Sequence, residues 1–246
     1  MKRIGWQIWL GISLVVLSAV LYFVHFKFFH DLHHIFIYLV GDIAFVPIEV
    51  LLVTIIIHKF LTEREKRSRL KKLNMVIGAF FSEVGTGLLK DMSTADTHAE
   101  KVKNDLKVLK KWPDRRFGQV RKRLKNYEYE IDIQKADLQA LKNFLKKKRG
   151  FLLALLENPN LLEHESFTDL LWSVFHLSEE LCQRKSVTDL PGTDYEHLAG
   201  DIKRAYSRLI AGWIEYMKHL KDDYPYLYSL AIRTNPFDDE AQPVVV

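Results

Sequence analysis

Residues 6–26 read WQIWLGISLVVLSAVLYFVHF, and residues 35–57 read IFIYLVGDIAFVPIEVLLVTIII. The first run has no Asp, Glu, Lys or Arg among its 21 residues, and the second has two acids among 23. A helix needs about 20 apolar residues to cross the hydrocarbon core of a bilayer, and 23 residues at 1.5 Å each reach about 34 Å. Each run therefore predicts one membrane-spanning helix.

The connection between the two runs is short. Only the eight residues KFFHDLHH at 27–34 separate them, so the helices must be antiparallel neighbours, which predicts a transmembrane hairpin over 1–58. A cleaved signal peptide is the competing interpretation of the first run, because Lys2 and Arg3 precede it. The run is long, however, and lacks a convincing small-x-small cleavage site.

Basic residues flank the hairpin at both of its outer ends. Lys2 and Arg3 precede the first run, and the second is followed by Arg64, Lys66, Arg67, Arg69, Lys71 and Lys72, which we expect at the membrane surface. The positive-inside rule then places both termini in the cytoplasm. The prediction is a multi-pass protein of the plasma (inner) membrane.

The rest of the chain is predicted to be helical. Apolar residues recur there at helical spacing, and no run alternates β-branched residues as a strand does. We expect a juxtamembrane helix or stalk over 59–92, a cytoplasmic helical-bundle domain over 93–237 and a flexible tail over 238–246. The predicted fold class is all-α.

Apolar spacing and capping residues indicate where individual helices run and what they pack against. Apolar residues at positions 70, 73, 77, 80 and 84 have an a/d-like spacing, which suits either a stalk shared with neighbouring chains or, as we favour, one amphipathic helix on its own domain or on the membrane surface. Ser166 and Thr193, each with an acid three residues later, are predicted to cap two later helices. The second helix would carry an apolar stripe of Leu198, Ile202, Tyr206, Leu209, Trp213 and Met217.

Asp42 and Glu49 are the two acids of the second run. They are seven residues apart, so they share one helix face. Without a Lys or Arg in either run, each acid must be protonated, face water, bind a cation or hydrogen-bond to a neighbouring helix. Aligning the two spans about their midpoints brings Tyr22 to the depth of Asp42 and Ser13 to that of Glu49. These four residues are candidates for an ion path, or else neutral acids that tie helices together.

Pro47 lies between the two acids. Its ring removes a backbone donor, so we expect a helix kink here and a free carbonyl near residue 43.

Histidines gather near the turn of the hairpin. His30, His33 and His34 lie beside Asp31, and imidazole with carboxylate can bind zinc, copper or iron. The spacing matches no recognised metal signature, and a turn at a membrane interface tolerates histidine. They are weak candidates, so the sequence assigns no metal and no cofactor.

Catalytic signatures are missing from the sequence. There is no G-x-S-x-G, phosphate-cradling glycine loop or H-E-x-x-H, and Cys182 is a single cysteine. His176 and Glu180 lie one turn apart, as do Glu215 and His219, but the doubled E-x-x-H of di-metal bundles is not found. We therefore predict a protein that is not an enzyme.

Charge is segregated along the chain. Residues 101–149 carry 17 basic and 6 acidic side chains, whereas residues 150–246 carry 8 basic and 16 acidic ones. The basic block suits an anionic lipid surface, a protein partner or contact with the acidic C-terminal block. Nucleic acid is not an expected partner, because no helix-turn-helix, zinc-finger or RNA-recognition signature accompanies the charges.

Three segments carry a family resemblance. GDIAFVPIEVLLVTIIIHKFLTEREKR at 41–67, LNMVIGAFFSEVG at 73–85 and YPYLYSLAIRTNPF at 224–237 resemble small prokaryotic two-span membrane proteins of unassigned function. The resemblance covers most of the chain and agrees with the two-span topology. It implies no activity, substrate or catalytic residue.

Two functions are therefore weighed. The leading hypothesis is a membrane-anchored interaction or sensory module, forming a homo-oligomer in contact with the lipid bilayer. The alternative is an oligomeric channel or ion-coupled membrane component that uses Asp42 and Glu49.

Overall fold

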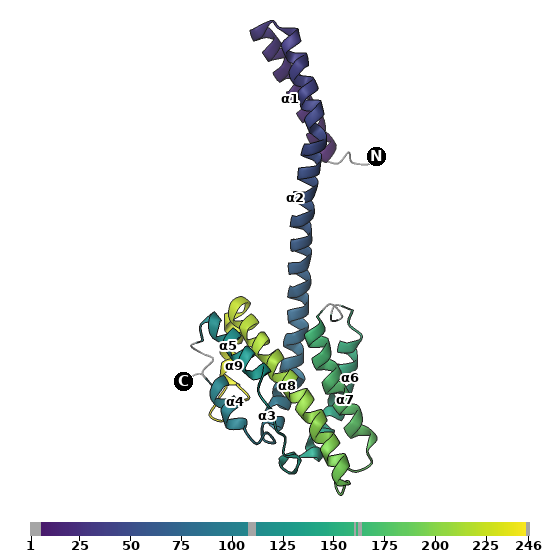
Figure 1. Ribbon diagram of the computed structural model, residues 1–246, viewed down its shortest axis with the longest axis vertical. Coiled ribbons are helices and arrows are strands. Elements are labelled where there is room, and N and C mark those ends of the chain that lie inside the picture. Colours follow the sequence, from purple (N-terminus) through teal and green to yellow (C-terminus); the bar gives the residue numbers. More distant parts are fainter. Residues whose placement is uncertain (1–5, 108–111, 160, 162–163, 245–246) are drawn as a thin grey trace. The chain divides into compact units, whose positions relative to one another are not determined.

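The computed structural model describes residues 6–107, 112–159, 161 and 164–244, apart from the side chains of Gln7, Leu32, Arg67 and Arg69. This part of the chain forms helices and no strand, which confirms the all-α prediction. The helices are α1 (Trp6–Phe29), α2 (Leu32–Phe80), α3 (Thr86–Ser93), α4 (Ala99–Leu106), α5 (Asp114–Lys125), α6 (Leu138–Leu156), α7 (Glu165–Gln183), α8 (Gly192–Asp223) and α9 (Pro225–Arg233) (Figure 1). A π-helical turn, η1 (Phe81–Gly85), follows α2, and a 3-10 turn, η3 (Ile133–Lys135), precedes α6.

The chain divides into two compact units, Met1–Lys66 and Arg67–Val246. The division falls inside α2. Residues 67–92, which we expected in a separate juxtamembrane segment over 59–92, therefore belong to the second unit.

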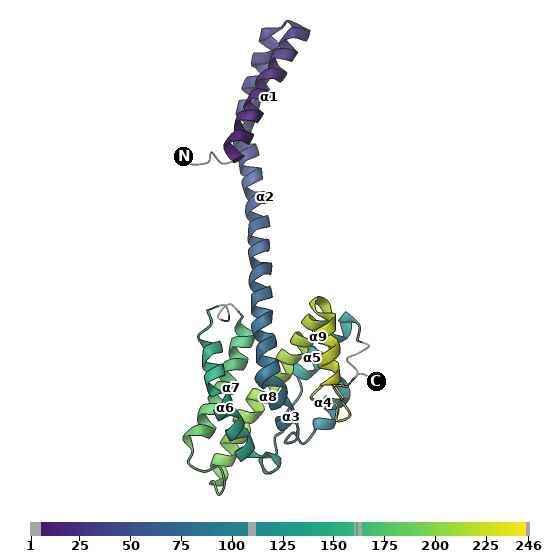
Figure 2. The same ribbon diagram turned by 180° about the vertical axis from the view of Figure 1, so that it is seen from behind.

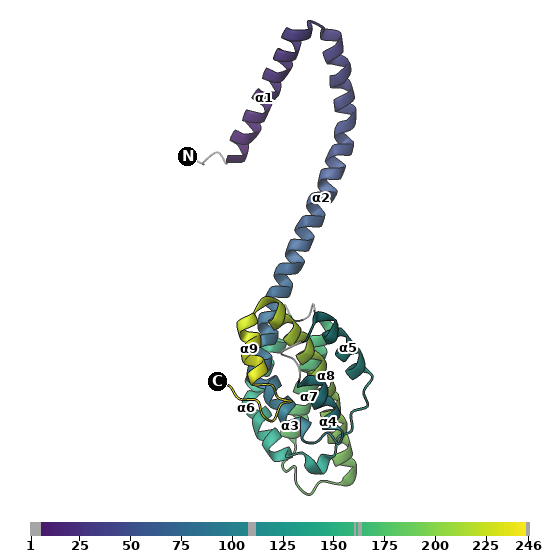
Figure 3. The same ribbon diagram turned by 90° about the vertical axis from the view of Figure 1, so that its left-hand side faces the viewer.

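The first unit is a helical hairpin. His30 has a positive φ of 50° at the turn, and Asp31 accepts a hydrogen bond from the backbone N–H of His34 at 3.1 Å, which caps the start of α2. Figure 3 shows α1 and the first part of α2 diverging from this turn. Most apolar side chains of α1 and of the first part of α2 are consequently exposed.

Two helices of the described chain are long and apolar enough to cross a membrane, by length and composition. One covers Ile8–Phe29 and the other begins at His33, and neither has any buried residue in its apolar window. Pro47 lies inside α2, which continues through it.

The second unit is organised around α8. Helix α8 packs on α7, α5, α9 and α3, and α7 packs on α6. Figures 1 and 2 show α6 and α7 on one side of α8, with α4, α5 and α9 on the other. The 32-residue helix α8 thus lies between the α6–α7 pair and the group formed by α4, α5 and α9.

The predicted apolar stripe of α8 is confirmed, since all six of its side chains are buried in the core. The a/d-like positions at the end of α2 face the same core. Leu73, Ile77, Phe80 and Val84 are buried, and only Leu70 is exposed. This packing agrees with an amphipathic helix on its own domain, because these side chains make contacts within the chain and are not available for a stalk shared with neighbouring chains.

Aromatic contacts fix the end of α2. The Phe80 ring lies 5.4 Å from the Phe167 ring on α7, and the Phe81 ring stacks on Tyr216 of α8 at 5.1 Å. The π-helical turn begins at Phe81 and has one glycine, Gly85. A Cβ atom at Gly85 would lie 2.5 Å from the Phe81 Cδ1 atom, so the turn needs a residue without a side chain here.

Both predicted helix caps were wrong. His164, not Ser166, precedes α7, and its Nδ1 atom accepts a hydrogen bond from the backbone N–H of Phe167. Pro191, not Thr193, precedes α8, and Thr193 lies inside the first turn. The proline at 191 is extended (φ −57°, ψ 149°) and sets the helix start two residues early.

We predict that Gly85→Ala destabilises the second unit by about 1–3 kcal/mol, because the added methyl overpacks against the fully buried Phe81. Gly150→Ala is the matched control. Gly150 lies inside α6, and a Cβ atom there would meet no neighbour within 4 Å, so alanine should stabilise by up to ~1 kcal/mol. Chemical denaturation followed by circular dichroism measures both, and equal stabilities for the two variants would contradict the packing at η1.

Candidate functional site

A cavity of about 790 Å³ lies in the second unit. Its wall combines the end of α2 (Asn74, Ile77), α5 (Arg121, Leu124, Lys125), the tyrosines at 127 and 129, the start of α7 (His164 to Asp169) and the face of α8 from Gly200 to His219. Helix α8 contributes half of the lining residues, because the apolar stripe that it turns to the core leaves its polar face to the cavity.

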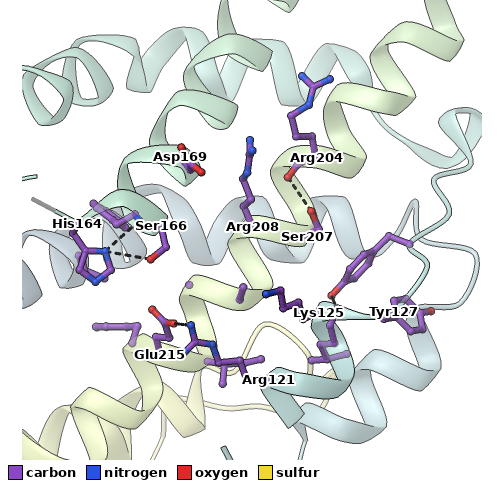
Figure 4. A pocket seen from close by; sticks show the side chains of 18 of the residues that line it. Arg121, Lys125, Tyr127, His164, Ser166, Asp169, Arg204, Ser207, Arg208 and Glu215 are labelled. Carbon is purple, nitrogen blue, oxygen red and sulfur yellow. Dashed lines mark hydrogen bonds and ion pairs between the residues drawn. The ribbon is translucent and has the colours of Figure 1, made fainter. Parts of the chain in front are cut away.

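Five cations line the cavity. Lys203, Arg204 and Arg208 come from α8, and Arg121 and Lys125 come from α5. Figure 4 shows Arg204 and Arg208 extending from α8 and the α5 side chains around the same space. Residues 204 and 208 are one helical turn apart, which brings both guanidinium groups to one face.

Only part of this positive charge is neutralised. The Arg121 Nη2 atom lies 2.6 Å from Glu215 Oε1, and the Arg204 Nη1 atom lies 2.8 Å from Asp201 Oδ1. Within the described chain, Lys125, Lys203 and Arg208 have no carboxylate within ion-pair distance. Asp169 is the other acid in the wall. The cavity is therefore electropositive.

Aromatic side chains form the apolar part of the wall. Burial raises the pKa of Tyr216 and of Tyr129, so both phenols stay protonated and neutral at physiological pH. The Tyr129 hydroxyl donates to the Leu124 carbonyl at 3.2 Å, and the Tyr127 hydroxyl donates to the His98 carbonyl at 3.2 Å. Faces of neutral rings beside free cations suit a ligand with an anionic group and a flat or apolar part.

A serine and a histidine also meet at the cavity edge. The Ser166 Oγ atom lies 3.2 Å from His164 Nδ1, as the dashed lines of Figure 4 show. That nitrogen already accepts the Phe167 N–H as the cap of α7, which ties the imidazole to the helix start. The contact is therefore explained by capping and does not point to a nucleophile with its base.

The hairpin brings together one of the two predicted pairs of polar residues. Tyr22 and Asp42 line the same groove of about 340 Å³, together with His25. Glu49 is exposed and lies outside that groove, and the Ser13 hydroxyl donates to the Leu10 carbonyl at 2.8 Å instead. No hydrogen bond between Ser13 and Glu49 is found among the described side chains.

The histidines of the turn do not form a cluster of ligands. The His25 and His34 rings stack at 6.2 Å, and His34 meets the Tyr38 ring at 4.7 Å. In the described chain, His30, His33 and His34 are not part of any group of three potential ligand atoms close enough to share an ion.

The basic residues that follow the hairpin are exposed where they are described. Arg64, Lys66, Lys71 and Lys72 face solvent, whereas the side chains of Arg67 and Arg69, like all of Lys2 and Arg3, lie outside the described residues.

Several cations of the basic block at 101–149 pair with the acidic C-terminal block. Lys103 contacts Asp239 at 2.9 Å, Arg121 contacts Glu215 at 2.6 Å, and Arg149 contacts Glu179 at 2.7 Å. Contact between the basic and acidic blocks is one of the three interpretations of the charge segregation.

Sequence analysis missed the cavity cations of α8. The pattern that could have indicated them is the spacing of Lys203, Arg204 and Arg208 on the side of the helix opposite the apolar stripe.

Comparison with known proteins matches both parts of the chain. A family model described as "Uncharacterized protein MJ1433, C-terminal helical domain" matches residues 69–233, and one described as "MJ1433, N-terminal helical domain" matches residues 2–61. A protein of Methanocaldococcus jannaschii, titled "Uncharacterized protein MJ1433", is 49% identical over 232 residues, which cover 94% of this chain and 93% of that protein. No solved structure matches. The matched ranges meet where the two compact units divide.

Proposed function

The chain belongs to the MJ1433 family. We propose that it is a membrane-anchored sensory module whose helical domain binds a small anion. The hairpin of α1 and the first part of α2 is the anchor, and the cavity beside α8 is the sensor site. The exposure of the apolar hairpin carries the proposal.

The anchor is supported by a contrast between the two units. The second unit buries most of its large apolar side chains in one core, whereas most of those of α1 and the first part of α2 are exposed. Each Leu, Ile, Val or Phe side chain left in water loses about 1.5–3 kcal/mol of the favourable free energy of burial. Transfer into the hydrocarbon core of a bilayer would provide that free energy.

The orientation follows from charge. Arg64, Lys66, Lys71 and Lys72 follow the apolar part of α2, while the turn between the helices holds Asp31 and Lys27. The positive-inside rule then places both termini and the cavity in the cytoplasm.

The ligand class follows from the cavity. Its three cations without a carboxylate partner, Lys125, Lys203 and Arg208, favour a multiply charged anion, and guanidinium groups bind phosphate oxygens in pairs. The neighbouring Tyr129 and Tyr216 rings suit the organic part of such a molecule. We therefore favour an organic phosphate as the natural ligand.

Self-association is part of the proposal. The two hairpin helices diverge from the turn (Figure 3), and neither Asp42 nor Glu49 has a hydrogen-bonding partner among the described side chains. A second hairpin would supply polar partners for these acids within a bilayer.

An ion path is the second candidate function. Asp42, Tyr22 and His25 line one groove of the hairpin, and several such grooves in an oligomer would bring titratable groups together. The anchored module is favoured because Glu49 lies outside that groove.

Membrane topology tests the anchor. In a Cys182→Ser background, His30→Cys should react with a membrane-impermeant maleimide in intact cells, because residue 30 is exposed and lies at the turn, between the two candidate spans. Gly150→Cys, on exposed α6, should react only after lysis. Labelling of Gly150→Cys in intact cells, or release of the full chain by alkaline carbonate, would exclude the proposed topology.

Binding of sodium tripolyphosphate at fixed ionic strength tests the cavity. We expect Lys203→Gln with Arg208→Gln to weaken binding at least tenfold, or by about 1.4 kcal/mol, as measured by titration calorimetry of the full chain. The control, Lys146→Gln with Lys147→Gln, removes the same charge from the exposed face of α6 and should change affinity less than twofold. Equal losses in the two double variants would show non-specific attraction instead of a site.

Reconstituted vesicles separate the two candidate functions. The anchored module predicts that Asp42→Asn and Glu49→Gln lower the mass of the detergent-solubilised particle, because the acids tie helices together, and that wild-type vesicles show no proton or cation flux. Glu63→Gln, beyond the apolar run, is the control. A flux that either substitution abolishes at unchanged particle mass would support the ion path instead.

A further inference from the structure

Four potential metal ligands meet between α7 and α8 in the second unit. His176 and Glu180 lie one turn apart on α7, and His197 and Asp201 lie one turn apart on α8. One ligand atom from each of the four residues lies within 4.8 Å of the others. Two helices thus each supply a histidine and a carboxylate at i and i+4, which places both on one face of the helix.

The distances fit a tetrahedral ion. Bonds of about 2.0–2.1 Å from zinc to nitrogen or oxygen place tetrahedral ligand atoms about 3.3 Å apart. The Asp201 Oδ2 atom lies 3.4 Å from the Nε2 atoms of both His176 and His197. Glu180 is slightly more distant, since its Oε2 atom lies 3.6 Å from His197 Nε2 and its Oε1 atom 3.9 Å from His176 Nε2.

Asp201 points independently to a bound cation. Its side chain is 1% exposed, yet its Oδ2 atom has no hydrogen-bond partner among the described residues. A buried carboxylate oxygen without a donor costs free energy unless a cation or a proton satisfies it. The unsatisfied atom is the one that faces both imidazoles.

An arginine holds each of the two carboxylates. Arg204 donates to Asp201 Oδ1 at 2.8 Å, which leaves Oδ2 to face the imidazoles, and Arg184 donates to Glu180 Oε2 at 2.7 Å, which leaves Oε1, 3.9 Å from His176 Nε2, as the oxygen for an ion. Arg184 is itself held by Asp194 through two hydrogen bonds. Outer-shell contacts of this kind orient the ligands of metal sites.

We propose that His176, Glu180, His197 and Asp201 form a zinc site that joins α7 to α8. Two imidazoles and two carboxylates suit Zn²⁺ in four-coordinate geometry. The histidine side chains are about half exposed, at 46% and 52%, so the ion has a path from solvent. None of the four proposed ligands belongs to the anchor or lines the cavity, so zinc binding can be tested separately from the proposed function.

Zinc binding to the full, tag-free chain tests the proposal. After chelator treatment, titration with ZnCl₂ against a chromophoric zinc chelator should reveal one tight site per chain. His176→Ala and His197→Ala should each weaken that site at least tenfold. Both side chains are half exposed, so the fold should persist, which far-UV circular dichroism checks.

The turn histidines provide the matched control. His30→Ala, His33→Ala and His34→Ala combined remove three imidazoles and should leave the tight site unchanged. If the triple variant loses zinc while His176→Ala keeps it, or if the wild-type chain binds no zinc saturably, the proposed site is wrong.

A second readout reports on geometry and helix joining. Co²⁺ in place of zinc should give the intense visible absorption of four-coordinate cobalt, and His197→Ala should lose it. Zinc should also raise the melting temperature of the wild-type chain but not that of His176→Ala, because a ligand that binds only the folded state stabilises it. Equal increases in the melting temperatures of the wild-type chain and of His176→Ala would overturn the assignment. An unchanged melting temperature of the wild-type chain would also overturn it and would indicate that the four side chains bind protons and no metal.

Discussion

Helix α8 can bury only one of its faces, and the rest of the second unit is arranged by that constraint. Its apolar stripe, from Leu198 to Met217, lies in the core between α7 and α5. The remaining faces of the same 32 residues cannot enter an apolar core without large desolvation costs. They therefore carry Lys203 and Arg208 to the cavity and the half-exposed His197 to the contact with α7, where the carboxylate of Asp201 is buried.

The helical fold could be predicted because it depends on local periodicity. The stripe of α8 and the seam at positions 73, 77, 80 and 84 are each visible within a single helix, and all of these residues are buried. The first residues of the helices were harder to predict from the sequence. His164 and Pro191 take the positions that Ser166 and Thr193 were expected to hold, since the start depends on the conformation of the preceding loop as well as on the capping residue.

The candidate sites depend on which helices become neighbours, and no single segment encodes that. Tyr22 and Asp42 were matched by depth because a short turn fixes an antiparallel pair. The cavity needs α5 beside α8, although they are far apart in sequence. The sequence shows that His176 and Glu180 are one helical turn apart on α7, and that His197 and Asp201 are one turn apart on α8. The two pairs form a single group of potential ligands only because the two helices pack with these turns side by side.

Arg204 belongs to the wall of the cavity and also holds Asp201. One guanidinium group thus stands between an anion site and a carboxylate that faces two imidazoles. A bound anion would draw this positive charge away from Asp201 and leave the carboxylate more negative in effect, and a cation at Asp201 would repel the guanidinium group toward the cavity and so favour the anion. Thermodynamic reciprocity then requires that an anion in the proposed cavity site and a cation in the proposed zinc site change each other's affinity by the same factor.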